Sequence, residues 1–216
     1  MARPTLNDGE RAVRRRQLLD AAQQLYREHG DLPTVASIAQ AAGVAKGSVY
    51  LSFATKEAIF VALLEDSFGQ LLVRLAPVIA GLPAEPEQAA SRFAAGYADA
   101  LAALPELLPL AAAANTVLEK NLPLEAAIAF KQGLAAGLQA AGAALEQNHG
   151  GLEAGRGSDL LLQTWALTLG LWQTLDYPAA VRPHLATPAL RILDRHFAPE
   201  LRAALCALWR GALSPQ

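Results

Sequence analysis

Residues 34–53 constrain the fold of this chain more than any other segment. Gly43 lies near the middle and permits a tight turn, because glycine adopts backbone conformations that other residues avoid. A second short helix is predicted over about 46–53, with Val49 and Phe53 one turn apart on its inner side. Before the glycine, apolar residues follow the i, i+3, i+4, i+7 spacing of one helical face: Val35, Ile38, Ala39 and Ala42. The segment therefore predicts two short helices joined by a glycine turn.

The outer side of the second helix carries residues that suit contact with DNA. Lys46 and Tyr50 are one turn apart and flank that side, and Lys56 follows at the start of the next helix. The same residue types also fit an ordinary small helical domain whose lysines are simply solvated. Three further residues are predicted to point away from the buried side: Gly47, Ser48 and Leu51.

A long helix is predicted upstream, from about residue 10 to residue 29, and it ends at Gly30. Leu18, Ala22 and Leu25 form its apolar stripe, which supplies the third helix that the pair needs to bury its inner face. Its amino-terminal turns are basic: Arg11, Arg14, Arg15 and Arg16, with Arg3 before them. A basic arm beside a reading helix is an expected phosphate contact, so Arg14 is assigned to DNA binding.

Residues 14–64 resemble the amino-terminal domain of the TetR/AcrR family of transcriptional regulators. The residues that carry the resemblance are Leu19, Ala21, Ala22, Leu25, Gly30, Thr34, Ile38, Ala39, Ala42, Gly43, Val44, Gly47, Tyr50, Phe53 and the run Lys56-Glu57-Ala58. The resemblance implies a three-helix helix-turn-helix domain in which Lys46, Gly47 and Tyr50 contact base edges or thymine methyl groups. It also implies that four residues contact phosphates: Thr34, Ser48, Ser52 and Lys56.

Two positions depart from the usual family pattern. Ala45 stands where relatives often carry a Ser or Thr that caps the reading helix, and loss of such a cap costs about 1 kcal/mol. Leu51 stands where relatives often carry an aromatic residue or His; it cannot donate a hydrogen bond, but it can meet a thymine methyl group. These departures leave the operator sequence open.

The distribution of charge indicates two domains with different partners. Residues 1–56 hold eight Lys and Arg against five Asp and Glu, a net charge of +3, whereas residues 57–216 hold ten against fifteen, a net charge of −5. Only the amino-terminal part matches DNA electrostatically. We therefore expect a DNA-binding domain over residues 1–54 and an effector-binding and dimerisation domain over residues 55–216.

Several other classes of protein find no support in the sequence. Cys206 is the single cysteine and fits a small buried apolar residue better than a redox sensor. The four histidines, at 29, 149, 184 and 196, lack metal-ligand spacing, so neither a metal nor another cofactor is predicted. No catalytic motif is present, and the sequence is not that of an enzyme. The charged start and the absence of a long apolar run predict a cytoplasmic protein without membrane association.

The remaining sequence predicts an all-α fold with roughly nine helices. A long amphipathic helix is predicted over 55–76, with Pro77 kinking or ending it, and Pro86 begins another helix. Further breaks are predicted at Pro105, at Pro109, over residues 121–123 and in the glycine-rich stretch 148–157. No alternation typical of a strand intervenes.

The last two helices predict a homodimer. Residues 158–177 are apolar nearly all round, which requires cover on both sides. The last helix is predicted to start with Thr187 as its cap and Pro188 in its first turn. Two such helices from each subunit would form a four-helix bundle, as in the TetR family, and two heads would bind a near-palindromic site. The residues assigned to the interface are Leu161, Trp165, Trp172, Leu190, Phe197, Leu201 and Leu205.

By resemblance, the carboxy-terminal domain holds a small-molecule effector whose binding relieves repression. The low charge of the segment favours an apolar or weakly polar effector. The candidate pocket residues combine aromatic rings with a few hydroxyls and amides: Phe93, Tyr97, Asn115, Thr116, Phe130, Trp165, Thr168, Leu169 and Trp172. The alternative is a helical interaction or ligand-binding module of the same fold without specific DNA binding. The sign of regulation, the genes and the effector itself are not fixed by these residues.

Overall fold

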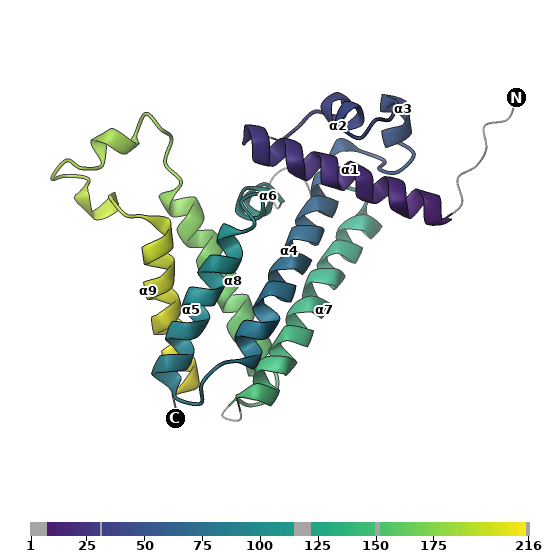
Figure 1. Ribbon diagram of the computed structural model, residues 1–216. Coiled ribbons are helices and arrows are strands. Elements are labelled where there is room, and N and C mark those ends of the chain that lie inside the picture. Colours follow the sequence, from purple (N-terminus) through teal and green to yellow (C-terminus); the bar gives the residue numbers. More distant parts are fainter. Residues whose placement is uncertain (1–7, 31, 115–121, 150–151, 215–216) are drawn as a thin grey trace, which may run out of the picture. The chain divides into compact units, whose positions relative to one another are not determined.

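The chain folds into helices, as the sequence predicts, with a long connection over residues 176–196 between α8 and α9 (Figure 1). The computed structural model describes residues 8–30, 32–114, 122–149 and 152–214. Within these ranges there are nine α-helices, two short 3-10 helices and no β-strand. The predicted all-α fold is confirmed. None of the helices in these ranges combines the length and apolarity needed to cross a membrane.

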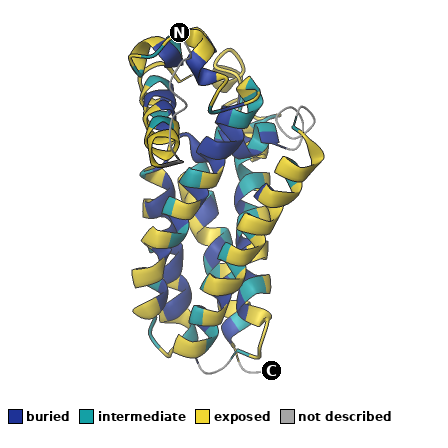
Figure 2. Cartoon of the chain, turned by 90° about the vertical axis from the view of Figure 1, so that its right-hand side faces the viewer, coloured by how far each residue is buried: buried dark blue, intermediate teal, exposed yellow. Residues whose placement is uncertain are grey.

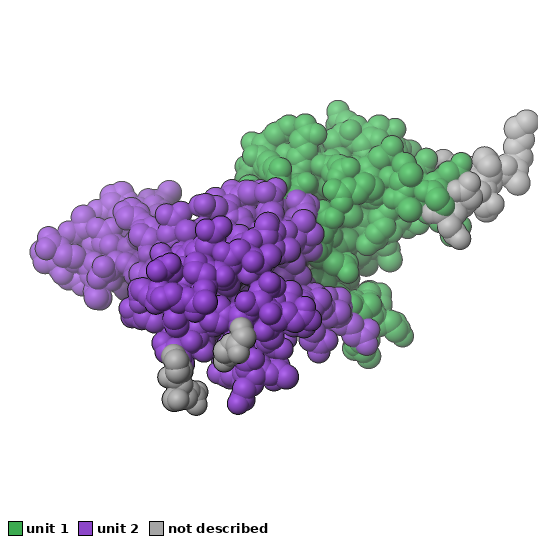
Figure 3. Space-filling model, turned by 60° about the horizontal axis from the view of Figure 1, so that its bottom comes forward, with its two compact units in different colours: residues 1–67, 105–131 green, residues 68–104, 132–216 purple. Residues whose placement is uncertain are grey.

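Two compact units divide the chain, and each contains two stretches of sequence (Figure 3). The first unit comprises residues 1–67 and 105–131, and the second comprises residues 68–104 and 132–216. The long helices α4 (Lys56–Ala80) and α7 (Leu124–Asn148) contribute residues to both units. The proposed domain boundary at residues 54 and 55 stays a prediction.

The first unit contains α1 (Asp8–His29), α2 (Val35–Ala41), α3 (Lys46–Val49), the start of α4 and α6 (Leu107–Ala113). As predicted, α1 ends at Gly30, whose φ of 77° is left-handed and therefore suits glycine. Its core is built from the apolar positions of these helices, including the fully buried Leu18, Ala22, Ile38 and Val49. Figure 2 shows this separation of buried and exposed helical faces.

The second unit is built around α5 (Pro86–Ala102), α8 (Arg156–Leu175) and α9 (Phe197–Leu213). Pro86 occupies the first turn of α5, as predicted, and the carboxylate of Glu85 caps the helix by accepting from the backbone N–H groups of Glu87 and Gln88. Helix α9 packs against both α5 and α8. Trp209 of α9 stacks on Phe93 of α5 with ring centroids 3.4 Å apart.

Two prolines at which the sequence allows or predicts a helix break, Pro77 and Pro109, lie inside helices. Pro77 lies inside α4, which continues to Ala80; it removes one backbone donor near the end of the helix, opposite Val73, whose side chain is exposed. Pro109 lies in the first turn of α6, where its missing N–H would have no helical partner in any case. The predicted break at Pro105 does occur, because it lies between α5 and α6.

The predicted start of the last helix at Thr187 and Pro188 is wrong. The Thr187 hydroxyl instead donates to the carbonyl of His184, and the chain makes two 3-10 turns, η3 (Arg182–His184) and η4 (Arg191–Leu193), before α9 begins at Phe197. Pro199 explains the late start. In a helix begun at residue 188 it would lie in the interior and break it, whereas in α9 it lies in the first turn.

Candidate DNA interface

Helix α2 is fixed at its start by side-chain capping. The Thr34 side chain accepts a hydrogen bond from the backbone N–H of Ser37 at 3.1 Å, and the Ser37 hydroxyl donates to the Thr34 carbonyl at 2.9 Å. The Thr34 side chain therefore satisfies a backbone N–H group that the helix leaves unpaired. Thr34 is exposed, so its assignment as a phosphate contact stays a prediction alongside its capping role.

The turn between α2 and α3 depends on Gly43. Its φ is 66°, in the left-handed region where a side chain would be strained. The backbone N–H of Gly43 donates to the carbonyl of Gln40 at 3.1 Å, and that of Val44 donates to the carbonyl of Ala39 at 2.9 Å. These bonds close the end of α2 and direct the chain into α3.

Helix α3 is shorter than the sequence suggests. It covers Lys46–Val49, and residues 50–52 continue as turns in place of the predicted helix to residue 53. Ala45 is the N-cap residue and, as its methyl side chain dictates, makes no capping hydrogen bond. Val49 and Phe53 are both buried, which confirms the predicted inner side.

The outer surface of this segment presents four exposed positions: Lys46, Gly47, Tyr50 and Leu51. Tyr50 is 48% exposed and Leu51 70%, so both side chains are accessible to a partner. Ser48 corrects the prediction, because only 8% of it is exposed and it faces the interior next to Val49. At Ser48 a phosphate contact through the side chain would require movement.

The arginines at the start of α1 differ in their availability. Arg16 contacts two carboxylates, Asp66 at 2.6 Å and Asp20 at 2.8 Å, and its hydrogen bond to Asp66 is the main cause that raises the pKa of its guanidinium. Arg15 is exposed and lies over the ring of Phe53, 4.3 Å from its centroid. Arg14, the residue assigned to DNA binding from the sequence, is half-buried.

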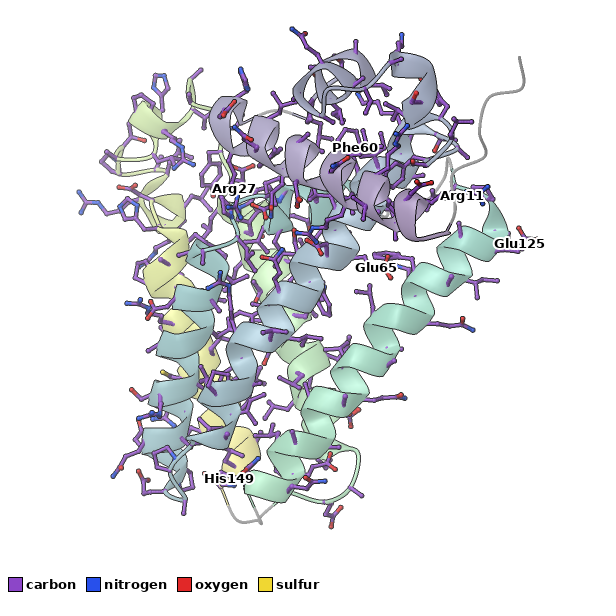
Figure 4. The ribbon with its side chains drawn as sticks, turned by 45° about the vertical axis from the view of Figure 1, so that its right-hand side comes forward. Arg11, Arg27, Phe60, Glu65, Glu125 and His149 are labelled. Carbon is purple, nitrogen blue, oxygen red and sulfur yellow. The ribbon has the colours of Figure 1, made fainter. Side chains whose placement is uncertain are left out.

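The start of α4 adds a further cation to this surface. The Thr55 hydroxyl accepts from the backbone N–H of Ala58 at 3.1 Å and caps the helix. Lys56 is exposed, and its Nζ lies 5.3 Å from the ring centroid of Phe60, which Figure 4 labels. Ser52, the remaining predicted phosphate contact, is half-buried.

The candidate effector residues are divided between the two units. Phe93, Tyr97 and Thr168 are buried in the second unit, whereas Phe130 is buried in the first. Trp165, Leu169 and Trp172 are half-buried on α8. Asn115 and Thr116 lie outside the described residues. The pocket stays a prediction.

A chain of hydrogen bonds joins several of these residues to α9. The Trp209 indole N–H donates to the Thr164 hydroxyl at 2.9 Å, and the Thr168 hydroxyl donates to the Thr164 carbonyl at 2.7 Å. The Tyr97 hydroxyl lies 3.1 Å from the Thr168 hydroxyl. Because Thr168 has a single hydroxyl proton, Tyr97 is the donor in this pair. These polar groups are therefore already partnered within the protein.

The predicted dimer residues fall into two groups. Leu161, Leu201 and Leu205 are at most 3% exposed in the single chain, so their assignment to an interface is wrong for this fold: they face the core of their own unit. Trp165, Trp172, Leu190 and Phe197 are half-buried. Helix α8 is thus covered on one side, and its other side carries Leu162, 54% exposed.

The fold and the exposed face of α3 define a class of protein, a helix-turn-helix protein with a second, larger helical unit. Residues 18–63 match the family model described as bacterial regulatory proteins, tetR family. Residues 70–216 match the model described as tetracyclin repressor-like, C-terminal domain. The chain belongs to the tetR family.

Individual relatives match less than a third of the chain. An HTH-type transcriptional repressor of Mycobacterium tuberculosis is 38% identical over 64 residues, which are 29% of this chain and 34% of that protein. The fatty acid metabolism regulator protein of Bacillus subtilis is 40% identical over 60 residues, 27% of this chain and 31% of that protein. The chain thus spans about a third of the length of these relatives.

The fold as a whole is similar to a solved structure. The regulator FadR from Bacillus subtilis, determined in complex with stearoyl-CoA, has a TM-score of 0.54 at 20% identity, covering 90% of this chain and 97% of that one. This similarity concerns the fold, whereas the family assignment favours a DNA-binding regulator over a module that has lost DNA binding.

Proposed function

We propose that this protein is a transcriptional repressor that binds a near-palindromic operator as a homodimer and is released by a small-molecule effector. The observation that carries the proposal is the surface of α3 and of the turn that follows it, where Lys46, Tyr50 and Leu51 are exposed above the buried Val49 and Phe53. To contact base edges in the major groove, exposed side chains must be held in place by a packed core beneath them. As a bacterial DNA-binding regulator, it would act in the cytoplasm.

The effector we propose is apolar or weakly polar. The candidate residues in the second unit are mainly aromatic or aliphatic, and the hydroxyls among them already have partners within the protein. The stearoyl-CoA complex of the Bacillus subtilis protein gives acyl thioesters as one class to include in a thermal-shift screen.

The test of DNA binding uses the purified protein and a salt series. A duplex site selected by the protein from a random library and a scrambled duplex of equal length are compared at each salt concentration. We expect steep salt dependence for both duplexes and preference for the selected site. Equal affinity for the two duplexes at every salt concentration would contradict specific regulation.

Two variants then distinguish contacts to phosphates from contacts to base edges. Lys56→Ala should weaken binding to both duplexes about equally and reduce the salt slope by about one, because it removes a phosphate contact. Tyr50→Ala should change the order of preference among sites, at a cost of about 1–3 kcal/mol for the best one. If Tyr50→Ala left both affinity and preference intact, the reading face would lie elsewhere.

A further inference from the structure

Glu106 is the one buried carboxylate in the part of the chain that the structure describes, and it lies in the first unit immediately before α6. Its side chain is fully buried, yet it does not cap α6. It accepts hydrogen bonds from Gln23 Nε2 at 2.5 Å, from Arg27 Nε and Nη2 at 3.3 Å each, and from Ser67 Oγ at 3.3 Å. None of these donors belongs to α6, the helix that follows Glu106.

The donors come from two helices of the DNA-binding unit. Gln23 and Arg27 are one turn apart on α1, and Ser67, itself fully buried, lies on α4. A buried carboxylate is tolerated only when donors compensate for its lost hydration, and here four contacts do so. The carboxylate therefore holds α1 and α4 together through bonds that depend on its charge.

Glu106 acts on the reading surface through α1. Helix α1 packs against α2, and α2 packs against α3, so the orientation of α1 sets the support of the reading helix. Yet Glu106 lies 43 residues beyond Leu63, where the match to the amino-terminal family model ends. We propose that Glu106 is a positioning residue of the DNA-binding unit, which is incomplete without it. The proposal rests on the proposed DNA-binding function.

Substitutions at Glu106 and Arg27 change the net charge in opposite directions, so they distinguish a positioning role from a general electrostatic effect on DNA affinity. Glu106→Gln removes a negative charge and, by electrostatics alone, would strengthen binding to any DNA. Arg27→Gln removes a positive charge and would weaken it. If the contact between the two side chains positions α1, both variants should instead lose preference for the selected site over the scrambled duplex.

The experiment compares Glu106→Gln, Arg27→Gln and the control Glu65→Gln in the full chain. Glu65 is exposed on α4 in the same unit, and Figure 4 labels it together with Arg27. Arg27 is 44% exposed, so its variant should fold even if Glu106→Gln does not. The ratio of the affinities for the selected and scrambled duplexes is measured for each variant. The concentration of protein able to bind DNA is determined by titration beforehand. Hydrogen exchange is measured separately in residues 18–29 and 197–213.

We expect the affinity ratio to fall about tenfold in Glu106→Gln and Arg27→Gln and to stay unchanged in Glu65→Gln. Exchange should become faster in residues 18–29 and not in residues 197–213. The proposal would be overturned if both variants kept the affinity ratio and the hydrogen-exchange rates of the wild type. It would also be overturned if the affinity ratio fell equally in Glu65→Gln. If the wild-type protein itself showed no preference, the proposed function would fail. The exchange of residues 18–29 would then decide the positioning role alone.

Discussion

Tyr97 carries its hydroxyl into the core of the second unit, where only 2% of the residue is exposed. Burial raises the pKa of this phenol well above its usual range. The neutral phenol is thus the form that the folded protein accommodates. In an unfolded chain the same group ionises with a pKa of about 10.

This difference predicts alkaline sensitivity that belongs to one residue. Because the pKa of Tyr97 is raised in the folded state, its stabilising contribution is complete below pH of about 10 and is lost as pH rises further. Tyr97→Phe should cost about 1 kcal/mol at neutral pH, through the lost hydrogen bond. Above pH of about 10, wild type should lose stability relative to the variant by up to about 1.4 kcal/mol per pH unit.

Urea unfolding of both proteins across pH 7 to about 12 measures this difference directly. The comparison with Tyr97→Phe removes the contributions that the two proteins share. A difference that stayed constant over the whole alkaline range would mean that the phenol reaches solvent in the native state.

At the scale of elements, α7 and α8 cross at a pair of glycines. A Cβ atom added to Gly142 of α7 would lie 2.7 Å from the Cα of Ser158 and closer still to its backbone nitrogen. On α8, the backbone N–H of Gly157 donates to Glu146 Oε1 of α7 at 2.8 Å. Backbone atoms of Ser158, together with its hydroxyl, fill the space, so rotation of a side chain cannot make room for a methyl group.

Gly142→Ala should therefore destabilise the protein by about 1–3 kcal/mol, as overpacking of a close contact does. The matched control is Gly69→Ala in α4, where an added Cβ meets nothing within 4 Å. That control should be neutral or stabilising by about 0.5–1 kcal/mol, because alanine favours helix more than glycine does. Chemical denaturation of both variants measures the contrast, and equal stabilisation would mean that the helices are free to separate.

How far the sequence predicts each element depends on how local its determinants are. The start of α2 at Thr34, the turn at Gly43 and the buried pair Val49 and Phe53 follow from caps and periodicity within a few residues. Two local signals conflict at the start of α9: Thr187 is a typical cap residue, but Pro199 excludes a helix that begins there. The start could be predicted only by giving Pro199 precedence.

Contacts between distant residues left no such local signal. Arg27 and Glu106 are 79 residues apart, and nothing in either neighbourhood shows that they meet. Ser48 has the polar side chain of a surface residue, and its burial depends on packing that helical spacing does not describe. The dimer assignments failed at Leu161, Leu201 and Leu205 because a uniformly apolar helix does not reveal which of its sides faces its own core.

We propose that two copies of the chain meet through α8. The dimer surface would be the side of this helix that its own unit leaves partly exposed. Leu162, Trp165, Leu169 and Trp172 follow a spacing of three, four and three residues, which places them in one stripe. Leu162 is 54% exposed, and Leu169 and Trp172 are half-buried. Trp165 is half-buried at the edge of this stripe, because its ring also contacts that of Phe68 on α4, with centroids 5.3 Å apart. A stripe of this kind is the apolar seam that a second copy of the chain would cover.

Leu162→Glu and Trp172→Glu should each produce monomers, because a charge in the centre of an apolar interface is left without hydration or a partner. Ile192→Glu is the control, since Ile192 is 72% exposed but lies on the connection between α8 and α9. Sedimentation velocity distinguishes the two states. Dimers that persisted in both stripe variants would place the interface elsewhere.

The glycine crossing also has a mechanical consequence. Two helices whose backbones touch cannot slide past each other without opening a gap, so a displacement of α8 is passed on to α7 rather than absorbed between them. Helix α7 begins in the first unit, since residues 124–131 belong to it. Gly142 and Gly157 thereby hold α7 and α8 in one register where the two helices cross, within the second unit.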